Sequence, residues 1–385
     1  MRTVLEILFW LSAALIVWTQ LGYALALAVV ARLFVPVSRR SAMDPSTGLP
    51  SLSLIVAAHD EQSVIAAKVE NALAVDYPRE LLQVIVACDG CSDATAARAK
   101  EAGADAVLEL HRGGKIRAQD AAVRAARAEI VAFSDANALW EPDAARALVG
   151  AFQDPRVGYA CGQVRFVQAA HGDAATNQEG LYWRYEMSVR SYESRLRSIT
   201  AGNGAIYATR REAYLVLDPI MGHDLSFPFN MVKRGWRAVY VPAARATEKM
   251  VPSIEGEFAR KRRMMSHTWP IVLRGGMLSP RGYGLGYGLM ILSHRILRYA
   301  TPALHAIVLV ANLLLVIEGV GVLYAITLAL QLGLLAAAAL GGAVQVRPLL
   351  LARYYVLTTT SLAAGLWDWL RHGTEASWDA AEGTR

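Results

Sequence analysis

The sequence predicts an α/β protein with a mostly parallel β-sheet and with α-helical membrane segments before and after it. Between residues 51 and 133, short apolar runs alternate with amphipathic stretches, which is the pattern of strands joined by crossover helices. Polar clusters follow these runs at His59, Asp89 and Asp135, and ligands of such sheets gather outside the carboxyl ends of the strands. Long apolar runs near both ends of the chain indicate the membrane segments.

The composition favours a membrane protein over a nucleic-acid-binding protein. Hydrophobic residues make up 54% of the 385 residues, and the mean hydropathy is +0.28, which is high for a soluble enzyme. The net charge of +6 suits nucleic acid or an anionic membrane face, but no nucleic-acid-binding signature accompanies it. Cys88 and Cys91 form an isolated CxxC, so we interpret them as reduced thiols in a turn.

An apolar run from about residue 4 to residue 34 is long enough to span a bilayer. Three arginines follow this run and one precedes it, so the positive-inside rule places the next domain in the cytoplasm. A polar linker at about 38–50 ends the anchor. The chain is therefore predicted to be an integral protein of the cell (inner) membrane with a cytoplasmic catalytic domain.

The C-terminal part is predicted to return to the membrane. From about residue 255 the chain is basic with interleaved aromatic residues, which is typical of a helix on the cytoplasmic membrane surface. Three further spans would leave the tail outside, whereas two spans and one interfacial run would return it to the cytoplasm. The apolar runs lie at about 300–317, 319–340 and 349–370. The predicted parts are an N-terminal anchor at 1–37, a cytosolic domain at 48–255, an amphipathic interfacial segment at 256–299, transmembrane helices at 300–371 and a tail at 372–385.

Inside the cytosolic domain the expected elements alternate along the chain. Strands are expected at 51–58, 82–88, 106–110, 130–133, 157–166 and 238–241, and a glycine-rich turn leads into another strand at 201–207. Helices are expected at 62–75, 93–102, 116–128, 179–197, from about 142 and from 224 to about 234. Strands that read as continuous apolar runs are typical of a sheet covered on both faces.

Four polar clusters can form one chemical site at the strand ends. Asp89 ends a strand, where a carboxylate can accept a hydrogen bond from a base edge or a ribose hydroxyl. Lys115 follows two glycines, where the backbone can approach a diphosphate. Asp135 and Asn137 offer hard oxygen ligands for a divalent cation, and Asp224 is available as a general base. Plainer interpretations are a turn for Asp89, a solvated charge for Lys115, and a turn or helix cap for Asp135 and Asp224.

The order of these clusters resembles the membrane-bound, inverting glycosyltransferases of family 2, which include hyaluronan, chitin, cellulose and poly-N-acetylglucosamine synthases. The resemblance covers about residues 50–300. The family's first strand with its AYNEE turn looks like Ser53-Leu-Ile-Val-Ala-Ala-His-Asp-Glu61. Its vDDgStDgT segment looks like Val86-Ala-Cys-Asp-Gly-Cys-Ser-Asp-Ala-Thr95, and its GK pair looks like Gly114-Lys115. The DxD, ED and QxxRW positions are taken by Ser134-Asp-Ala-Asn137, Gly222-His-Asp224 and Arg260-Lys-Arg-Arg263-Met264.

The resemblance implies a nucleotide-diphospho-sugar transferase (GT-A-like) fold and a set of roles. It implies Asp224 as the base that deprotonates the acceptor hydroxyl, and Asp135 and Asn137 as ligands of Mg²⁺ or Mn²⁺. The nucleotide-sugar donor would contact His59, Glu61, Asp89, Lys115 and Asp135. Residues that would meet the acceptor or close over the donor are Gly202, Asn203, Gly204, His223, Arg260 and Arg263.

Several positions differ from the family pattern. Asn137 stands at the second DxD aspartate and keeps a carbonyl oxygen as a ligand. His223 replaces the acid beside the base: a neutral imidazole removes a repulsive charge, whereas a protonated one lowers the pKa of Asp224. Arg260 and Met264 replace Gln and Trp of QxxRW, a motif tied to processive synthases. We therefore expect transfer of one or a few sugars.

The sequence thus predicts a metal-dependent, inverting hexosyltransferase of the membrane. Its donor would be a nucleotide sugar, most simply a UDP-sugar, and its acceptor a lipid-linked or polysaccharide molecule in cell-envelope or exopolysaccharide synthesis. Nucleic acid is not an expected partner. Two alternatives stay open: a processive polysaccharide synthase of the same family, and a non-catalytic degenerate transferase that acts as an assembly partner in glycan export.

Overall fold

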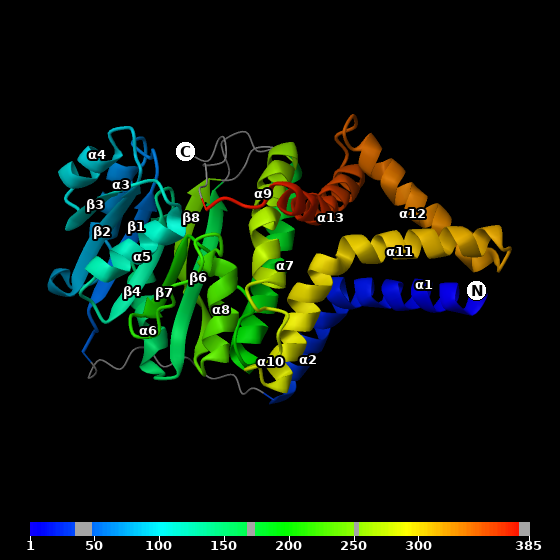
Figure 1. Cartoon of the computed structure of the whole chain (residues 1–385), viewed down its shortest axis with the longest axis horizontal. Helices are drawn as coiled ribbons and strands as arrows, with labels where there is room; N and C mark the ends of the chain where they lie inside the picture. The colour runs from blue at the N-terminus through cyan, green and yellow to red at the C-terminus, as the bar shows by residue number, and fades with distance from the viewer. Residues whose placement is uncertain (35–47, 168–173, 250–253, 377–385) are drawn as a thin grey trace.

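The computed structural model of the chain describes residues 1–34, 48–167, 174–249 and 254–376 (Figure 1). It shows an α/β domain with a group of long helices beside it (Figure 1). Residues 38–47 of the predicted linker and 377–385 of the predicted tail lie outside the described ranges.

One eight-stranded mixed sheet forms the centre of the α/β domain. Its spatial order is β3-β2-β1-β4-β7-β6-β8-β5. The first four strands of that order run parallel, and β7 pairs antiparallel with β4. The predicted α/β fold is confirmed, and the carboxyl ends of β1, β2 and β4 meet at one edge. The strands are β1 Leu52–Ala58, β2 Leu82–Asp89, β3 Ala106–Leu110, β4 Ile130–Asp135, β5 Leu139–Trp140, β6 Val157–Val167, β7 Ile206–Arg210 and β8 Arg237–Lys249.

Helices cover both faces of this sheet. Leu54 and Val56 of β1 belong to the core on the side of α3, α4 and α6, whereas Ile55 and Ala57 belong to the core on the side of α5 and α8. Burial on both sides explains why this strand is a continuous apolar run in the sequence. The helices of the domain are α3 Ile65–Leu73, α4 Thr95–Glu101, α5 Lys115–Ala125, α6 Ala144–Gly150, α7 Ala174–Leu196, α8 His223–Lys233 and α9 Ile254–Leu273, with 3₁₀ turns η2 Arg79–Leu81 and η3 Ala151–Gln153.

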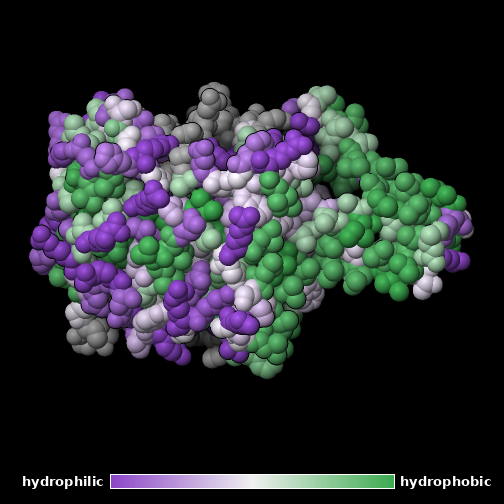
Figure 2. Space-filling view, in the orientation of Figure 1, coloured by the Kyte–Doolittle hydropathy of each residue, from purple (hydrophilic) through white to green (hydrophobic). Residues whose placement is uncertain are grey.

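In the described chain, 4 helices are long and apolar enough to cross a membrane. Figure 2 shows an almost uninterrupted apolar surface over the part of the molecule that α1, α11 and α12 form. Such a surface suits a bilayer and not water. These helices are α1 Arg2–Val17 joined by the π-helical η1 Trp18–Gly22 to α2 Tyr23–Phe34, α10 Leu285–Met290 joined by the π-helical η4 Ile291–Ile296 to α11 Leu297–Ile317, then α12 Val322–Leu340 and α13 Arg347–His372.

The second candidate span starts earlier than the apolar run that predicted it. The helix begins at Leu285, whereas the sequence predicts an apolar run from about residue 300. Arg295 and Arg298 interrupt the apolar pattern, but both pair with Glu186 of α7, so the helix continues through them. The predicted interfacial segment is therefore divided between α9, which packs along α13, and the first turns of this helix.

Close packing between α13 and α9 depends on Gly365. A Cβ at this position would overlap Met265 Cβ and lie 2.8 Å from the Arg262 carbonyl oxygen, and small residues are what allow such helices to approach. We expect Gly365→Leu to lower the free energy of unfolding by about 1–3 kcal/mol through overpacking. Thermal unfolding in detergent measures this effect. Gly333→Leu on α12, where a Cβ meets nothing within 4 Å, is the control, and an equal loss in both variants would contradict the prediction.

Candidate active site

A lysine and an aspartate form an ion pair at the carboxyl edge of the sheet. Lys115 is the first residue of α5, Asp135 is the last residue of β4, and Lys115 Nζ contacts Asp135 Oδ1. Burial favours a lower pKa for Lys115, but the charges of Asp135 and Asp224 outweigh it and raise the pKa. Gly204 faces the pair, since a Cβ there would lie 3.3 Å from Lys115 Nζ and 3.8 Å from Asp135 Oδ2. The structure therefore brings three predicted site residues, Lys115, Asp135 and Gly204, together.

Asp89 holds the turn that leads into Lys115. Its carboxylate accepts the backbone N–H groups of Gly113 at 2.7 Å and Gly114 at 2.9 Å. Gly114 has a φ of +93°, which favours glycine. Asp89 is 1% exposed, so in this structure it is buried below the site and fixes the backbone of the turn before Lys115. Its predicted contact with the nucleoside stays a prediction.

We expect Asp89→Ala to destabilise the protein because two backbone N–H groups lose a charged acceptor. Charge-assisted hydrogen bonds contribute roughly 1.5–3 kcal/mol each, so a loss of about 3–6 kcal/mol is expected for the two. Thermal unfolding in detergent measures the change. Asp76→Ala is the control, because its carboxylate forms an exposed ion pair with Arg146 and such pairs contribute little. A loss no larger than that of Asp76→Ala would contradict the prediction.

The residues after β1 form a separate group. His59 Nδ1 lies 2.7 Å from the carbonyl oxygen of Asp89, and the backbone N–H of Glu61 donates to Thr95 Oγ1 at 2.8 Å. Among the described residues, possible ligand atoms of His59, Asp60 and Cys91 lie within 4.8 Å of one another. Imidazole and thiolate ligands suit zinc more than Mg²⁺. This group therefore differs in kind from the oxygen site predicted at Asp135, and the sequence, in which Cys91 is only part of an isolated CxxC, did not indicate it.

Asp224 and His223 begin α8. The Asp224 carbonyl oxygen accepts the N–H of Gly202 at 2.6 Å, and the Asp224 side chain is half-buried. His223 Nδ1 lies 2.8 Å from the Tyr207 hydroxyl. Burial, together with the charge of Lys115, lowers the pKa of His223 to about 3, so the imidazole is neutral near pH 7. Of the two predicted effects of His223, the structure supports the neutral one, which leaves Asp224 without a second acid beside it.

The glycine-rich turn before β7 is anchored by Asn203. The Asn203 amide donates to the Gly162 carbonyl oxygen at 2.7 Å, and its side-chain oxygen accepts the Ile206 N–H at 2.9 Å. A Cβ on Gly202 would overlap the Tyr159 hydroxyl. The Asn203 side chain therefore fixes the turn, and its predicted contact with an acceptor stays a prediction.

The two predicted arginines of α9 have different surroundings. Arg260 donates through Nε and Nη2 to the Glu257 carboxylate, at 2.7 Å each. Arg263 is exposed, and its carbonyl oxygen lies 3.1 Å from His267 Nδ1. Arg260 influences the charge of the site through Glu248. The contacts of the described residues do not join Arg263 to the Lys115–Asp135 pair, so its predicted role stays a prediction.

Sequence reasoning missed two charged residues near Asp135. Lys68 of α3 is fully buried and donates to the Ala138 carbonyl oxygen at 2.6 Å, and burial lowers its pKa to about 7. Glu248 of β8 directly follows Thr247, which pairs with Leu139. Burial and the charge of Asp135 raise the pKa of Glu248 to about 7. The position of Lys68 on the apolar face of a helix was a usable signal, whereas the position of Glu248 depends on strand pairing.

The mostly parallel mixed sheet is typical of the GT-A fold of glycosyltransferases. The family model described as glycosyltransferase like family 2 matches residues 50–266. The chain belongs to this glycosyltransferase family.

Named relatives and a solved structure extend the comparison. Two N-acetylglucosaminyltransferases, from Rhizobium sp. (strain N33) and Mesorhizobium japonicum, are 25% and 26% identical over 55% and 57% of this chain. The chain spans about half the length of these relatives, 51% and 56%. A mannosyltransferase from Pyrobaculum calidifontis, solved with GDP-Man and Mn²⁺, superimposes with a TM-score of 0.74 at 22% identity and covers 95% of this chain and 99% of its own. At that identity the likeness shows the fold.

Proposed function

We propose that this protein is a membrane-bound, metal-dependent, inverting glycosyltransferase that uses a UDP-sugar and a lipid-linked or polysaccharide acceptor in cell-envelope or exopolysaccharide synthesis. The observation that carries the proposal is the Lys115–Asp135 pair at the carboxyl edge of the sheet, within electrostatic range of Asp224. The names of the two relatives support N-acetylglucosamine as the transferred sugar.

The oxygen donors at this edge fit a hard divalent cation, Mg²⁺ or Mn²⁺. Asp135 offers a carboxylate, Asn137 a carbonyl oxygen two residues later, and Glu248 a second carboxylate within electrostatic range. Oxygen ligands of this kind suit such ions. A cation held by these residues supplies positive charge against the leaving diphosphate.

The chain's own residues account for the other parts of the reaction. Lys115 donates to diphosphate oxygens and offsets the charge that develops when the bond to the sugar breaks. Asp224 accepts the proton of the acceptor hydroxyl while that oxygen bonds to the anomeric carbon. The diphosphate leaves from the opposite face, so one displacement inverts the configuration. Because His223 is neutral, it adds no charge of its own beside the carboxylate of Asp224.

The membrane arrangement in the proposal follows the four apolar helices. We assign an N-terminal anchor to 1–37 and membrane helices to the part after the catalytic domain, with that domain in the cytoplasm of a cell with an inner membrane. The arginine bias around the first run supports this orientation. The site would then lie beside the bilayer, where a lipid-linked acceptor is within reach.

A donor panel tests the proposed function. The purified protein in detergent would be incubated with UDP-, GDP- and TDP-sugars in Mg²⁺ or Mn²⁺, and the released nucleoside diphosphate would be measured with and without a lipid extract. We expect release with one UDP-sugar, stimulated by lipid extract and abolished by EDTA. Turnover that EDTA leaves intact would overturn the metal, and retention of the donor's anomeric configuration in the product would overturn the inverting mechanism.

A further inference from the structure

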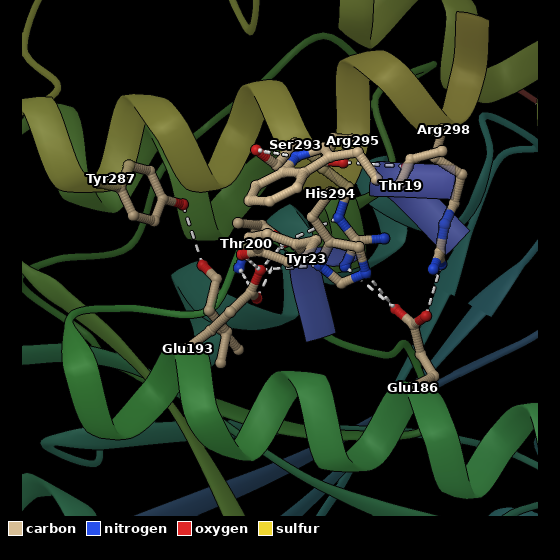
Figure 3. Close-up of polar contacts among 12 residues, drawn as sticks. Thr19, Tyr23, Glu186, Glu193, Thr200, Tyr287, Ser293, His294, Arg295 and Arg298 are labelled. Atoms are coloured by element: carbon tan, nitrogen blue, oxygen red, sulfur yellow. Dashed lines mark hydrogen bonds and ion pairs between the residues drawn. The ribbon is translucent and has the colours of Figure 1, made fainter. Parts of the chain in front are cut away.

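A buried polar cluster joins the catalytic domain to helices from both ends of the chain (Figure 3). It contains two carboxylates, two guanidinium groups and an imidazole, and all but Arg298 are less than 9% exposed. We call this set the membrane-side cluster, and its members are Tyr23, Glu186, Glu193, Thr200, His294, Arg295 and Arg298.

Glu193 is the centre of one half of the cluster. Its Oε1 accepts the Tyr23 hydroxyl at 2.7 Å and lies 2.7 Å from His294 Nδ1. Its Oε2 accepts both the N–H and the hydroxyl of Thr200 at 3.0 Å. Burial alone would raise the pKa of Glu193, but His294 and Arg295 outweigh it and keep the carboxyl ionised. One carboxylate therefore binds α2, η4 and the segment that follows α7.

Glu186, about two turns earlier on α7, is the centre of the other half. Its carboxylate lies 3.1 Å from His294 Nε2, 2.5 Å from Arg298 Nη1 and 3.4 Å from Arg295 Nη2. Among the described residues, the ion pairs and hydrogen bonds of Glu186 are with η4 and α11, and none of them is with Thr200. The two halves thus share charge and burial but differ in their link to the segment after α7.

Thr200 connects the membrane-side cluster to the backbone segment that leads into the active site. Arg295 Nε donates to Thr200 Oγ1 at 2.8 Å, and the Tyr287 hydroxyl donates to the Ile199 carbonyl oxygen at 3.0 Å. Two residues after Thr200, the N–H of Gly202 donates to the Asp224 carbonyl oxygen at 2.6 Å. Residues 199–204 therefore run from the helices η4 and α10 to the proposed base and end at Gly204 beside the Lys115–Asp135 pair.

The energetics of the cluster point to a role beyond stability. Each buried ion loses several kcal/mol of solvation, and well-packed apolar residues are often at least as stable as a buried ion network. Buried hydrogen-bonded networks instead fix one geometry, and π-helical turns such as η4 occur frequently at functional sites. The geometry fixed here is that of residues 199–204.

We propose that Glu193, Thr200 and Arg295 are positioning residues, which hold residues 199–204 so that Gly202 fixes the backbone of Asp224 against the acceptor. This inference rests on the proposed function, because it assigns these residues to the same reaction. It makes the membrane helices part of the frame of the active site. A misplacement of about 1 Å can lower a rate by about 10²-fold.

The decisive variant is Thr200→Val, which removes the hydroxyl and keeps the branched shape. We expect it to lower kcat by about 10- to 100-fold while the donor KM changes less than about twofold. Faster hydrogen exchange of the amides of residues 199–205 is expected in the same variant. Thr200→Ser, which keeps the hydroxyl, is expected to restore kcat to within about threefold of the wild type.

Two controls separate positioning from loss of stability. Thr209→Val makes the same substitution at a buried hydroxyl that has no hydrogen-bond partner among the described residues, and it is expected to change neither readout. Glu186→Gln leaves the direct contacts of Thr200 in place but weakens the hold on Arg295 and His294, so we expect a lower Tm and a loss of kcat clearly smaller than in Thr200→Val. Equal losses of kcat and equal exchange of residues 199–205 in Glu186→Gln and Thr200→Val would overturn the positioning role.

The exchange measurement keeps this inference distinct from the proposed function. If the wild-type protein transfers no sugar from any donor, the proposed function fails. Independently of that result, unchanged hydrogen exchange of residues 199–205 in Thr200→Val would overturn the positioning role. If the wild type is active and Thr200→Val exchanges faster but keeps full kcat, the contact exists and its catalytic role is overturned.

Discussion

Asp224→Asn is expected to lower turnover by about 10²- to 10⁴-fold, because the amide cannot accept the proton of the acceptor hydroxyl. The backbone hydrogen bond from Gly202 does not involve the side chain, so the turn and the donor site should stay in place. Nucleoside diphosphate binding, measured by titration calorimetry in the presence of Mn²⁺, is therefore expected to change less than about threefold.

Asp218→Asn is the matched control for this result. Asp218 lies on the same connection between β7 and α8, and its exposed carboxylate accepts the Ile220 N–H at 3.1 Å. We expect this variant to keep wild-type turnover. Wild-type turnover in Asp224→Asn would remove Asp224 as the base, and an equal loss in both variants would show that the connection itself, and not the carboxylate, is needed.

Asp135→Asn is expected to weaken Mn²⁺-dependent nucleotide binding by at least about 100-fold, since the variant loses both a charged ligand and the partner of Lys115. Turnover should fall at least as much. Titration of the protein with Mn²⁺ and a nucleoside diphosphate, together and separately, measures the loss of metal affinity and the loss of nucleotide affinity. Electron paramagnetic resonance of free Mn²⁺ gives the metal affinity without any need for activity.

Asp143→Asn serves as the control for the loss at Asp135. Asp143 lies at the start of α6, a few residues after Asp135, and is exposed without a side-chain cap hydrogen bond. Its substitution is expected to leave Mn²⁺ and nucleotide binding unchanged. Undiminished Mn²⁺ affinity in Asp135→Asn would contradict the assignment of Asp135 as a ligand.

The strands and the centre of the site could be predicted because their signals are local. β1, β2 and β4 are continuous apolar runs that end in polar residues, and parallel strands place those ends at one edge. Lys115 and Asp135 are 20 residues apart in the sequence, and they are in contact because both lie at this edge. The glycines before Lys115 also mark a turn that local reasoning can recognise, since Gly114 adopts a positive φ.

The remainder depends on pairings that no local pattern records. The position of Glu248 follows from the antiparallel pairing of β8 with the two-residue strand β5, which the sequence does not indicate. Arg295 looks like an interruption of an apolar run until Glu186, 109 residues earlier, is placed beside it. Lys68 differs from these two, because its place on the apolar face of α3 was a local signal, and only its contact with the Ala138 carbonyl oxygen depends on packing.

The membrane-side cluster also determines the order in which parts of the protein can fold during synthesis. Tyr23 leaves the ribosome 170 residues before Glu193, and His294 follows Glu193 by 101 residues. Domains generally fold as units while synthesis proceeds, so the α/β domain would emerge with the carboxylates of α7 still lacking their cations. In the proposed membrane arrangement, the contacts of these carboxylates form only after α10 and α11 lie beside α2, so membrane insertion and completion of the α/β domain are coupled. A fragment limited to residues 48–255 would lack every one of these partners from α2, η4 and α11.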